Sequence, residues 1–396
     1  MKLMFITFAP LSSNAGHLAR LISELNNIKK LNMVSIVCLN KNADDDNTIK
    51  KYKEIKFLHL PIEFNGWKIV SLSRVVQNII KLINKESPNL VILQMEVWDL
   101  MRELGKKLKN KMPFAVIVHS TPFLGSPINM STSFEHDVVK YTNSGIEDYR
   151  KKYILNHFNE AKDVFKNINI IASNKTVKYF MSNYFPNLNI YTLPLSPIPK
   201  TKIFKGNNKS FKYDFVYMAR IEKGKGIEYL NKILENISKI VSRPVKIAIL
   251  GRTDDLFSQT NLDQLINNSK LNKKNYTVDY LGWADEKLKK KILLNSKIFL
   301  YPSIYDTYAI VLQEALSYGL PVITWDVPFA RLNYKTSSVI KVSLFDTTKF
   351  ADEAARALNH RENLSIKALK FSSTLNSSTE IALADTKLFK EIFNNE

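Results

Sequence analysis

Two short segments of the sequence place charged side chains where an anionic ligand could be bound. In the first segment Arg220 precedes Lys225, and Gly224 and Gly226 flank the lysine. Arginine can hold phosphate oxygens with two N–H groups, lysine adds a point charge, and glycines let backbone N–H groups approach a ligand where a helix begins. The segment therefore suits a diphosphate, and a solvated basic turn is the alternative.

The second segment holds two carboxylates, Asp306 and Glu314. A helix that begins near residue 309 would have Asp306 just before it and Glu314 in its second turn, so both could face one cleft and accept hydrogen bonds from sugar hydroxyls. We expect four backbone N–H groups to remain free for phosphate or sugar oxygens, those of Thr307, Tyr308, Ala309 and Ile310. The alternative is a helix cap at Asp306 and an exposed helical residue at Glu314.

Histidines form a weaker signal. His119 follows the apolar run Phe114–Val118, so we expect it at the carboxyl end of a strand, where a neutral imidazole could bind a hydroxyl or stabilise charge. A structural histidine in a turn is the alternative. Gly16 and His17 precede a helical pattern and suit either a ligand or a cap. The histidines offer no pairing typical of a metal site, so we expect no metal.

The elements that must position these residues follow from apolar periodicity. Short apolar runs alternate with helical patterns, which is typical of mostly parallel sheets covered on both faces, the doubly wound α/β class. The expected strands are Leu3–Phe8, Met33–Leu39, Ile55–Leu60, Leu90–Leu93, Phe114–Val118, Ile168–Ala172, Phe215–Ala219, Val245–Leu250, Tyr276–Leu281, Ile298–Tyr301 and Val322–Thr324.

The alternation stops once and then resumes, which predicts two domains. We expect an N-terminal Rossmann-like domain over 1–196, a proline-containing linker over 197–210, a second Rossmann-like domain over 211–375 and a C-terminal helix within 376–396 that returns to the N-terminal domain. Sheets of this type bind ligands at the carboxyl ends of their strands. The predicted site is therefore a cleft between the two domains.

Composition limits the function classes. With 396 residues, 45% apolar and 24% charged, the chain is long enough for two cores and is not mainly disordered. Fifty-seven basic residues against 37 acidic ones give a net charge of +20, which favours an anionic partner: a nucleic acid, an acidic membrane surface or a phosphorylated substrate. The basic residues are spread along the chain, which disfavours nucleic acid.

Compartment signals point inside the cell. The single cysteine, Cys38, cannot form an internal disulfide and fits a reducing compartment. The opening apolar run is too short for a signal peptide, and no run approaches the ~18 apolar residues of a spanning helix. We expect a soluble cytoplasmic protein.

The charged segments resemble those of the retaining GT-B glycosyltransferases similar to glycosyltransferase family 4. A motif of Arg, four residues and Lys-Gly binds the donor diphosphate in that family, and it is similar to Arg220, Lys225 and Gly226. Its acid-x7-acid motif is similar to Asp306 and Glu314. The resemblance implies that Asp306 and the backbone after it hold the transferred sugar and that Glu314 binds the ribose hydroxyls.

Other parts of the chain share the resemblance. Gly251-Arg252-Thr253 is similar to the family's donor-side loop, which implies donor contacts from Arg252 and Thr253, and Leu281-Gly282-Trp283 is similar to its segment beside the nucleobase, which implies one from Trp283. The N-terminal glycine loop is represented by Gly16 and His17. Departures are the shorter acid at Asp306, and Thr307 and Ala309 where the family often has glycine.

The resemblance implies transfer of a sugar from a nucleotide-diphosphate sugar to a glycan or lipid-linked acceptor, with retention of configuration. His119, Asp306 and Lys225 would be the catalytic residues. No cofactor or metal is expected, because basic side chains and helix N-termini neutralise the leaving diphosphate. Acceptors at the membrane's inner face would make the protein peripheral there. The apolar stripe within Trp67–Lys85 would dock on an acidic membrane or pack against its own sheet.

Two other function classes share parts of this pattern. A nicotinamide-dependent dehydrogenase needs a Gly-x-Gly-x-x-Gly turn after the first strand, and residues 9–20 lack it. A non-catalytic basic nucleic-acid- or nucleotide-binding protein is the remaining alternative. For nucleic acid it would need an aromatic-rich basic face or a known module, and the sequence shows neither.

Overall fold

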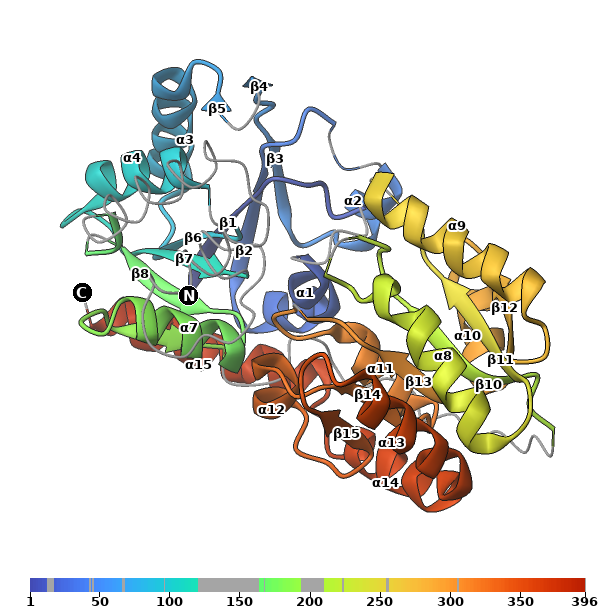
Figure 1. Cartoon of the computed structure of the whole chain (residues 1–396). Helices are drawn as coiled ribbons and strands as arrows, with labels where there is room; N and C mark the ends of the chain where they lie inside the picture. Colours follow the sequence, from blue (N-terminus) through green and yellow to red (C-terminus); the bar gives the residue numbers. More distant parts are fainter. Residues whose placement is uncertain are drawn as a thin grey trace. The chain divides into compact units, whose positions relative to one another are not determined.

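The computed structural model describes residues 1–12, 18–42, 44, 46–65, 68–95, 97–119, 164–166, 168–193, 210–222, 224–253, 256–304 and 306–395. These residues form two compact units (Figure 1), one made of the described residues up to 193 together with those from 376 onward, and one made of 210–375. The predicted site residues Gly16 and His17 lie outside the described residues, as does the predicted linker apart from residue 210.

The first unit is built on a seven-stranded parallel sheet in the order β3-β2-β1-β6-β7-β8-β9. Its strands are β1 Lys2–Thr7, β2 Met33–Cys38, β3 Lys56–His59, β6 Leu90–Leu93, β7 Phe114–Val118, β8 Asn169–Ala172 and β9 Ile190–Thr192. A small antiparallel hairpin, β4 Phe64–Asn65 and β5 Lys68–Ile69, precedes α3. The helices are α1 Ala19–Leu31, α2 Asp46–Lys51, α3 Leu72–Glu86, α4 Trp98–Leu108, α7 Lys175–Tyr184 and α15 Ser378–Asn394.

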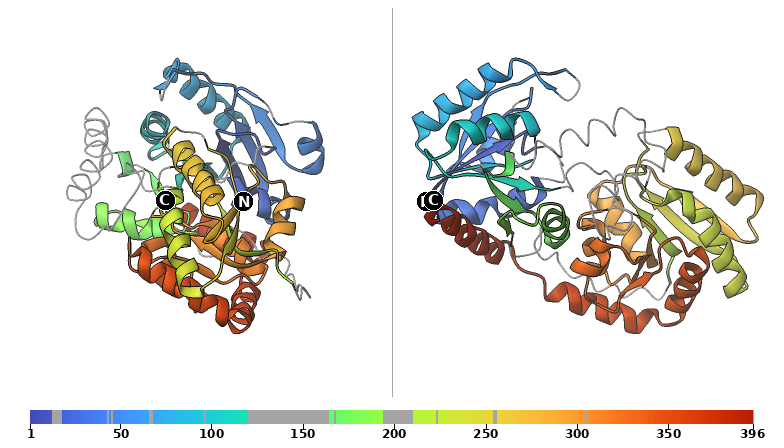
Figure 2. Two further views of the ribbon diagram at one scale, coloured as in Figure 1. Left: turned by 45° about the vertical axis from the view of Figure 1, so that its right-hand side comes forward. Right: turned by 60° about the vertical axis from the view of Figure 1, so that its left-hand side comes forward.

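Helices cover both faces of this sheet (Figure 2) because successive strand residues point to opposite sides. Met4 and Ile6 of β1 pack in a core with residues of α3, α4 and α7, whereas Leu3 and Phe5 pack in a second core with residues of α1 and α15. The apolar stripe of α3 lies in the first of these cores, since Val76, Ile79 and Ile83 are buried there. The stripe packs against its own sheet.

The last helix of the chain belongs to the first unit. It begins with a capping box, in which the Ser377 hydroxyl accepts from the Glu380 backbone N–H and the Glu380 carboxylate accepts from the Ser377 N–H. The helix, red in Figures 1 and 2, then packs along α1, with the Phe389 ring 6.1 Å from that of Phe5. The expectation that the C-terminal helix returns to the N-terminal domain is confirmed.

The second unit has a six-stranded parallel sheet in the order β12-β11-β10-β13-β14-β15. Its strands are β10 Tyr213–Met218, β11 Val245–Leu250, β12 Tyr276–Tyr280, β13 Ser296–Tyr301, β14 Val322–Trp325 and β15 Val339–Val342. Its helices are α8 Ile227–Val241, α9 Leu256–Leu271, α10 Glu286–Leu294, α11 Ile310–Ser317, α12 Pro328–Asn333, α13 Thr347–Asn359 and α14 Arg361–Ser373.

The second sheet positions the predicted donor residues. Strands β10 and β13 are neighbours in the centre of the sheet, although Ser296, where β13 begins, is 296 − 219 = 77 positions after Ala219, which follows β10. Because parallel strands end at the same edge, the loops that follow them meet there. The doubly wound α/β class predicted for both halves of the chain is confirmed.

Candidate functional site

The loop after β10 is held against the loop after β13 by glycine. Gly226 has φ +93° and is the N-cap residue of α8, and a Cβ atom there would lie 2.1 Å from the Pro302 carbonyl oxygen. The Ile304 N–H donates to the Gly224 carbonyl at 2.9 Å, and the Tyr217 hydroxyl donates to the Lys225 carbonyl at 3.1 Å. The backbone of the basic segment is therefore fixed from both sides.

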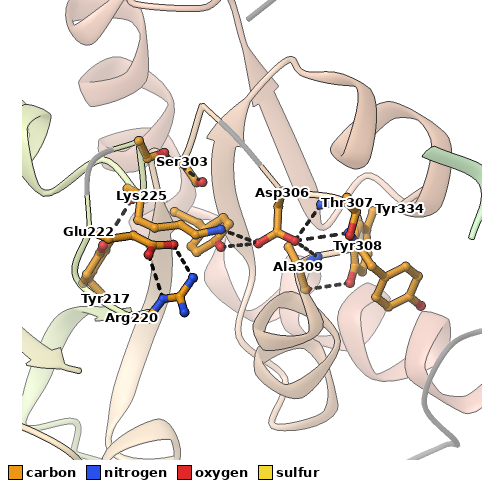
Figure 3. A network of polar contacts seen from close by, with 12 residues as sticks. Tyr217, Arg220, Glu222, Lys225, Ser303, Asp306, Thr307, Tyr308, Ala309 and Tyr334 are labelled. Atoms are coloured by element: carbon orange, nitrogen blue, oxygen red, sulfur yellow. Dashed lines mark hydrogen bonds and ion pairs between the residues drawn. The ribbon is translucent and has the colours of Figure 1, made fainter. Parts of the chain in front are cut away.

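Lys225 and Asp306 meet at this junction (Figure 3). The Lys225 Nζ lies 3.0 Å from the Asp306 Oδ2, which also accepts from the Tyr301 hydroxyl at 2.8 Å. Burial opposes ionisation of Asp306, but the charge and hydrogen bond of Lys225 and the other donors hold its pKa below the ordinary value. Burial and the Asp306 charge raise the pKa of Tyr301, so its hydroxyl stays protonated and donates.

The other oxygen of Asp306 is also occupied. Its Oδ1 accepts from the backbone N–H groups of Thr307 at 2.8 Å, Tyr308 at 3.2 Å and Ala309 at 2.8 Å, which Figure 3 shows on the side of Asp306 away from Lys225. The prediction that these three N–H groups are free for a ligand is wrong, because the preceding side chain reaches them first. Ile310 starts α11, as expected. The alternative of a helix cap at Asp306 is wrong as well, because Ala309 is the N-cap residue of α11 and no side chain caps that helix.

The turn that follows Asp306 has a strained backbone, and hydrogen bonds from two side chains support it. Ala309 has φ +58°, in the left-handed region that non-glycine residues seldom adopt. The buried Tyr334 hydroxyl donates to the Ala309 carbonyl at 2.8 Å, and the Asn333 side chain donates to the Thr307 carbonyl at 3.3 Å. These contacts offset the strain and fix the segment before α11.

Arg220 and Glu314 both have partners of their own. Arg220 is exposed and holds Glu222 through Nε and Nη2 at 2.8 Å each. Glu314 on α11 accepts from the Lys289 Nζ of α10 at 2.8 Å. Burial opposes the charge of Lys289, but Glu314 and Glu286 raise its pKa. Sequence reasoning missed Lys289, because nothing in the acid-x7-acid spacing refers to α10.

The loops after β10, β11 and β12 are joined as well. The Ile221 N–H donates to the Arg252 carbonyl at 2.9 Å, and the Gly251 N–H donates to the Gly282 carbonyl at 2.8 Å. A Cβ at Gly251 would lie 1.9 Å from the Ala219 carbonyl oxygen. The Arg252 guanidinium lies 5.7 Å from the centre of the Trp283 ring, which is 68% exposed. The structure thus brings these predicted donor residues to one edge of the sheet.

Thr253 lies at the same edge. It forms a parallel bridge with Ile221, and its hydroxyl donates to the Gln259 side chain of α9 at 2.5 Å. Its position follows from the bridge between the loops after β10 and β11. Its predicted donor contact stays a prediction.

His119 lies in the first unit, at the carboxyl end of β7. Burial of the imidazole and the charge of Arg20 lower the pKa of His119 to about 4, although a hydrogen bond with the Gln94 backbone acts in the opposite sense. The imidazole is therefore neutral at pH 7, as its predicted role requires. Gln94, buried after β6, was missed, although it follows an apolar strand just as His119 does.

The described part of the chain holds neither a cluster of metal ligands nor a membrane-spanning helix. No group of three or more histidine, cysteine or acidic side chains there could hold a metal ion. No helix there combines the length and the apolar character needed to cross a bilayer.

Comparison with known proteins fits this geometry. Residues 199–370 match the family described as glycosyl transferases group 1, a stretch that contains both charged segments. A sucrose-phosphate synthase from Thermosynechococcus elongatus is similar over 100% of both chains, with a TM-score of 0.70 and 14% identity. The architecture is that of the GT-B glycosyltransferases. A second GT-B neighbour, the pneumococcal O-GlcNAc transferase GtfA in complex with UDP and GlcNAc, covers 99% of each chain at a TM-score of 0.65 and 13% identity.

Curated relatives match only in part. The GtfA subunit of a UDP-N-acetylglucosamine–peptide N-acetylglucosaminyltransferase from Streptococcus agalactiae is 20% identical over 302 residues, which are 75% of this chain and 51% of that protein. An uncharacterized 41.2 kDa protein in the cps region of Klebsiella pneumoniae is 28% identical over 116 residues, 29% of this chain and 28% of that protein. The matches therefore span about half or less of the relatives' own length.

Proposed function

We propose that the protein is a glycosyltransferase that takes its sugar from a nucleotide-diphosphate sugar. The observation that carries this proposal is the contact of Lys225 with Asp306, which joins the loop after β10 to the loop after β13 within the stretch that matches the glycosyl transferases group 1 family. A basic loop at the start of a long helix beside a carboxylate-bearing loop suits a diphosphate joined to a polar sugar.

Each charged group has a role in the proposal. Arg220 and Lys225, with the amide end of α8, neutralise the diphosphate as it leaves. Glu314 releases the Lys289 ammonium and accepts hydrogen bonds from the ribose hydroxyls instead. Trp283 and Arg252 lie beside the base. The charge needed by the leaving group comes from this chain's own cations, so the proposal includes no metal and no cofactor.

Retention of configuration is part of the proposal. The bond from the anomeric carbon to the diphosphate oxygen breaks, and the acceptor oxygen forms the new bond on the same face of the sugar. The acceptor proton passes to the departing diphosphate, so no enzyme nucleophile is needed. Neutral His119 donates or accepts a hydrogen bond at the donor sugar and cannot add a positive charge beside the anomeric carbon.

The acceptor is proposed to be a glycan or a lipid-linked sugar at an acidic membrane surface. Exposed cations on two helices that pack together, α3 and α4, support this part of the proposal. We call them the α3–α4 basic face: Arg74, Lys81 and Lys85 on α3, Lys106 and Lys107 on α4, and Lys109 and Lys111 just after α4. The acidic residues of the two helices are already paired, Glu86 with Lys56, Asp99 with Arg102, and Glu103 with Arg102 and with Lys106 of the face itself. Such a face is attracted to anionic lipid.

Vesicle flotation tests the membrane contact. We expect binding to vesicles with 30% phosphatidylserine, weakening as salt rises, and little binding to phosphatidylcholine alone. Lys81→Glu with Lys107→Glu should abolish flotation, whereas Lys387→Glu with Lys390→Glu on α15 should not. Equal binding to both lipids would contradict the membrane part and leave sugar transfer standing.

Ligand-induced thermal stabilisation tests the donor. UDP comes first, since a neighbour of this fold is recorded with UDP and GlcNAc, followed by GDP, ADP and their sugar esters. One diphosphate and its sugars should raise Tm selectively. Lys225→Ala and Glu314→Ala should then lower transfer to glycan and lipid-linked acceptors at least tenfold while the fold persists. Salt-sensitive binding to nucleic acid, with no affinity for any nucleotide sugar, would favour the non-catalytic alternative.

A further inference from the structure

Polar residues follow three neighbouring strands of the first sheet. Gln94 comes directly after β6, His119 after β7 and Ser173 after β8. The hydrogen bonds of the sheet still hold two of them. The Gln94 N–H donates to the Ile6 carbonyl at 2.9 Å, and the Ser173 N–H donates to the Val118 carbonyl at 3.0 Å. Open parallel sheets bind their ligands at this carboxyl edge.

The three polar residues lie on the face of the sheet that α1 and α15 cover. The residues two positions earlier in the same strands, Ile92, Ile117 and Ile171, pack in one core with residues of both helices. Successive strand residues alternate between the two faces of a sheet. The polar residues therefore share the face of these isoleucines and lie at the end of the layer that the isoleucines form.

Gln94 carries a buried amide oxygen. The residue is only 2% exposed, and its Oε1 accepts from no donor in the described part of the chain. A buried polar atom without a hydrogen-bond partner destabilises a folded protein. An apolar side chain of the same size would suit a purely structural position better, so the amide indicates a ligand that donates to it.

The groups beside Gln94 favour a neutral ligand. His119 forms a hydrogen bond with the Gln94 backbone, and its imidazole is neutral at pH 7 because burial and the charge of Arg20 lower its pKa to about 4. Arg20, the cation that acts on this imidazole, donates to both carboxylate oxygens of Asp385. An amide and a neutral imidazole match the hydroxyl groups of a sugar better than they match a phosphate or a carboxylate.

We infer that Gln94 binds a hydroxyl group of a neutral sugar through its Oε1, next to His119. The inference rests on the proposed function and makes it more specific, because it assigns a part of sugar recognition to the end of β6. Such a hydroxyl can come from the transferred sugar of the donor or from the sugar of the acceptor.

Two substitutions and one control test this role. Gln94→Met keeps the length of the side chain and removes the amide, and Gln94→Asn keeps the amide but withdraws it by one methylene. The control is Asn32→Leu at the amino end of β2, where the buried Asn32 Nδ2 donates to the Thr386 hydroxyl at 2.8 Å and to the Ile28 carbonyl at 3.3 Å. Without ligand, the free energy of unfolding should stay the same or rise for Gln94→Met, because no protein donor to Oε1 is lost, and should fall for Asn32→Leu.

Binding to the full chain is measured for the two sources of the hydroxyl. Calorimetry with UDP, GDP and ADP, each beside its glucose ester, tests the donor sugar. Both Gln94 variants should bind the free diphosphate as wild type does and lose about tenfold in affinity for its glucose ester. Titration with methyl α-glucoside, methyl β-galactoside and methyl N-acetyl-β-glucosaminide, followed by the NMR signal of the His119 Cε1–H, tests an acceptor sugar. Asn32→Leu should match wild type in both measurements.

The outcomes separate the inference from the proposed function. A loss of affinity confined to the glucose ester or to the glycosides supports the inference and identifies the source of the hydroxyl. Unchanged binding of both sugars by either Gln94 variant would overturn it, as would an equal loss for diphosphate and ester, or a Gln94→Met protein destabilised as much as Asn32→Leu. A wild-type protein that binds a diphosphate but no sugar in either measurement would overturn the inference alone. A wild-type protein that binds none of the six nucleotides would overturn the proposed function, and the inference with it.

Discussion

The guanidinium of Arg20 on α1 donates to both carboxylate oxygens of Asp385 on α15, at 2.7 and 2.5 Å, across 365 positions of sequence. The side chains are 3% and 1% exposed. Glu24 lies beside them, and burial together with the negative charge of Asp385 raises its pKa well above the usual value. Arg20 Nε also lies 3.9 Å from Glu24 Oε1, so one cation faces two carboxyl groups, and the raised pKa of Glu24 favours its protonated form in this buried set.

Asp385→Ala should destabilise the first unit strongly. The variant removes both hydrogen bonds from the buried Arg20 to Asp385, and breaking a buried ion pair costs about 3–5 kcal/mol. Urea unfolding followed by circular dichroism measures the loss. Lys387→Ala, on the exposed face of α15, should stay within about 0.5 kcal/mol of wild type. A loss below about 1 kcal/mol for Asp385→Ala would mean that the pair contributes little.

Glu24→Gln should change how stability depends on pH. Because the folded-state pKa of Glu24 is raised, the wild-type fold keeps the full contribution of this group below the ordinary value of 4.5 and loses it as pH rises toward the raised pKa. The glutamine variant keeps the neutral shape at all pH values. The free energy of unfolding of the variant should therefore increase relative to that of wild type as pH rises from 5 to 8, by about 1.4 kcal/mol for each pH unit between the ordinary and the raised pKa.

Urea unfolding at pH 5, 6, 7 and 8 measures this difference. Glu54→Gln, at a glutamate whose side chain is 71% exposed, controls for the amide substitution. A Glu24→Gln difference that is constant across these pH values would contradict the protonated state.

His119 should remain neutral well below the ordinary histidine range. Its folded pKa of about 4 lies below the value of 6.5 for an unperturbed histidine, so the folded chain binds fewer protons than the unfolded chain between these values. The contribution of His119 to stability is then complete above pH 6.5 and is lost as pH falls toward 4, by about 2 kcal/mol between pH 7 and pH 5.

Two measurements check His119. NMR of the imidazole Cε1–H should show one titration near pH 4, and His119→Asn should show a smaller loss of stability between pH 7 and pH 5. A midpoint near 6.5 would place the ring in water and contradict a buried neutral role.

Two glycines should differ sharply in their tolerance of alanine. Gly226→Ala would place a Cβ 2.1 Å from the Pro302 oxygen in a left-handed backbone, which should cost about 3 kcal/mol or more and disrupt binding of the donor diphosphate. Gly282→Ala meets nothing within 4 Å and should cost only the backbone strain, about 1–2 kcal/mol. Urea unfolding and calorimetry measure both, and equal losses would contradict the contact with Pro302.

The sheet strands were largely predictable because parallel strands buried on both faces are continuous apolar runs. Leu90–Leu93, Phe114–Val118 and Val245–Leu250 have the predicted bounds. The short elements at the sheet edges were not predicted, namely β4, β5, β9 and β15. Edge strands of two to four residues carry too little pattern to be distinguished from turns.

The site was predictable as a set of residues but not as a set of contacts. The spacing brought Lys225 and Asp306 to one edge of one sheet, since both follow central strands. The spacing could not show that the Asp306 carboxylate accepts hydrogen bonds from backbone N–H groups of its own loop, or that the buried Tyr301 hydroxyl donates to it. Those contacts depend on side-chain directions and on depth, which a linear pattern does not record. The pair of Arg20 with Asp385 was missed because it joins helices at opposite ends of the chain.

The position of α15 late in the sequence determines the order in which the two units can fold during synthesis on the ribosome. Phe389 and Ile392 complete the core under α1, so the first unit to be synthesised is the last that can close. At typical rates of synthesis the apolar side of α1 waits on the order of tens of seconds for its partner. During that time the second unit can fold around its own sheet. The apolar side of α1 in the first unit stays exposed unless another molecule covers it.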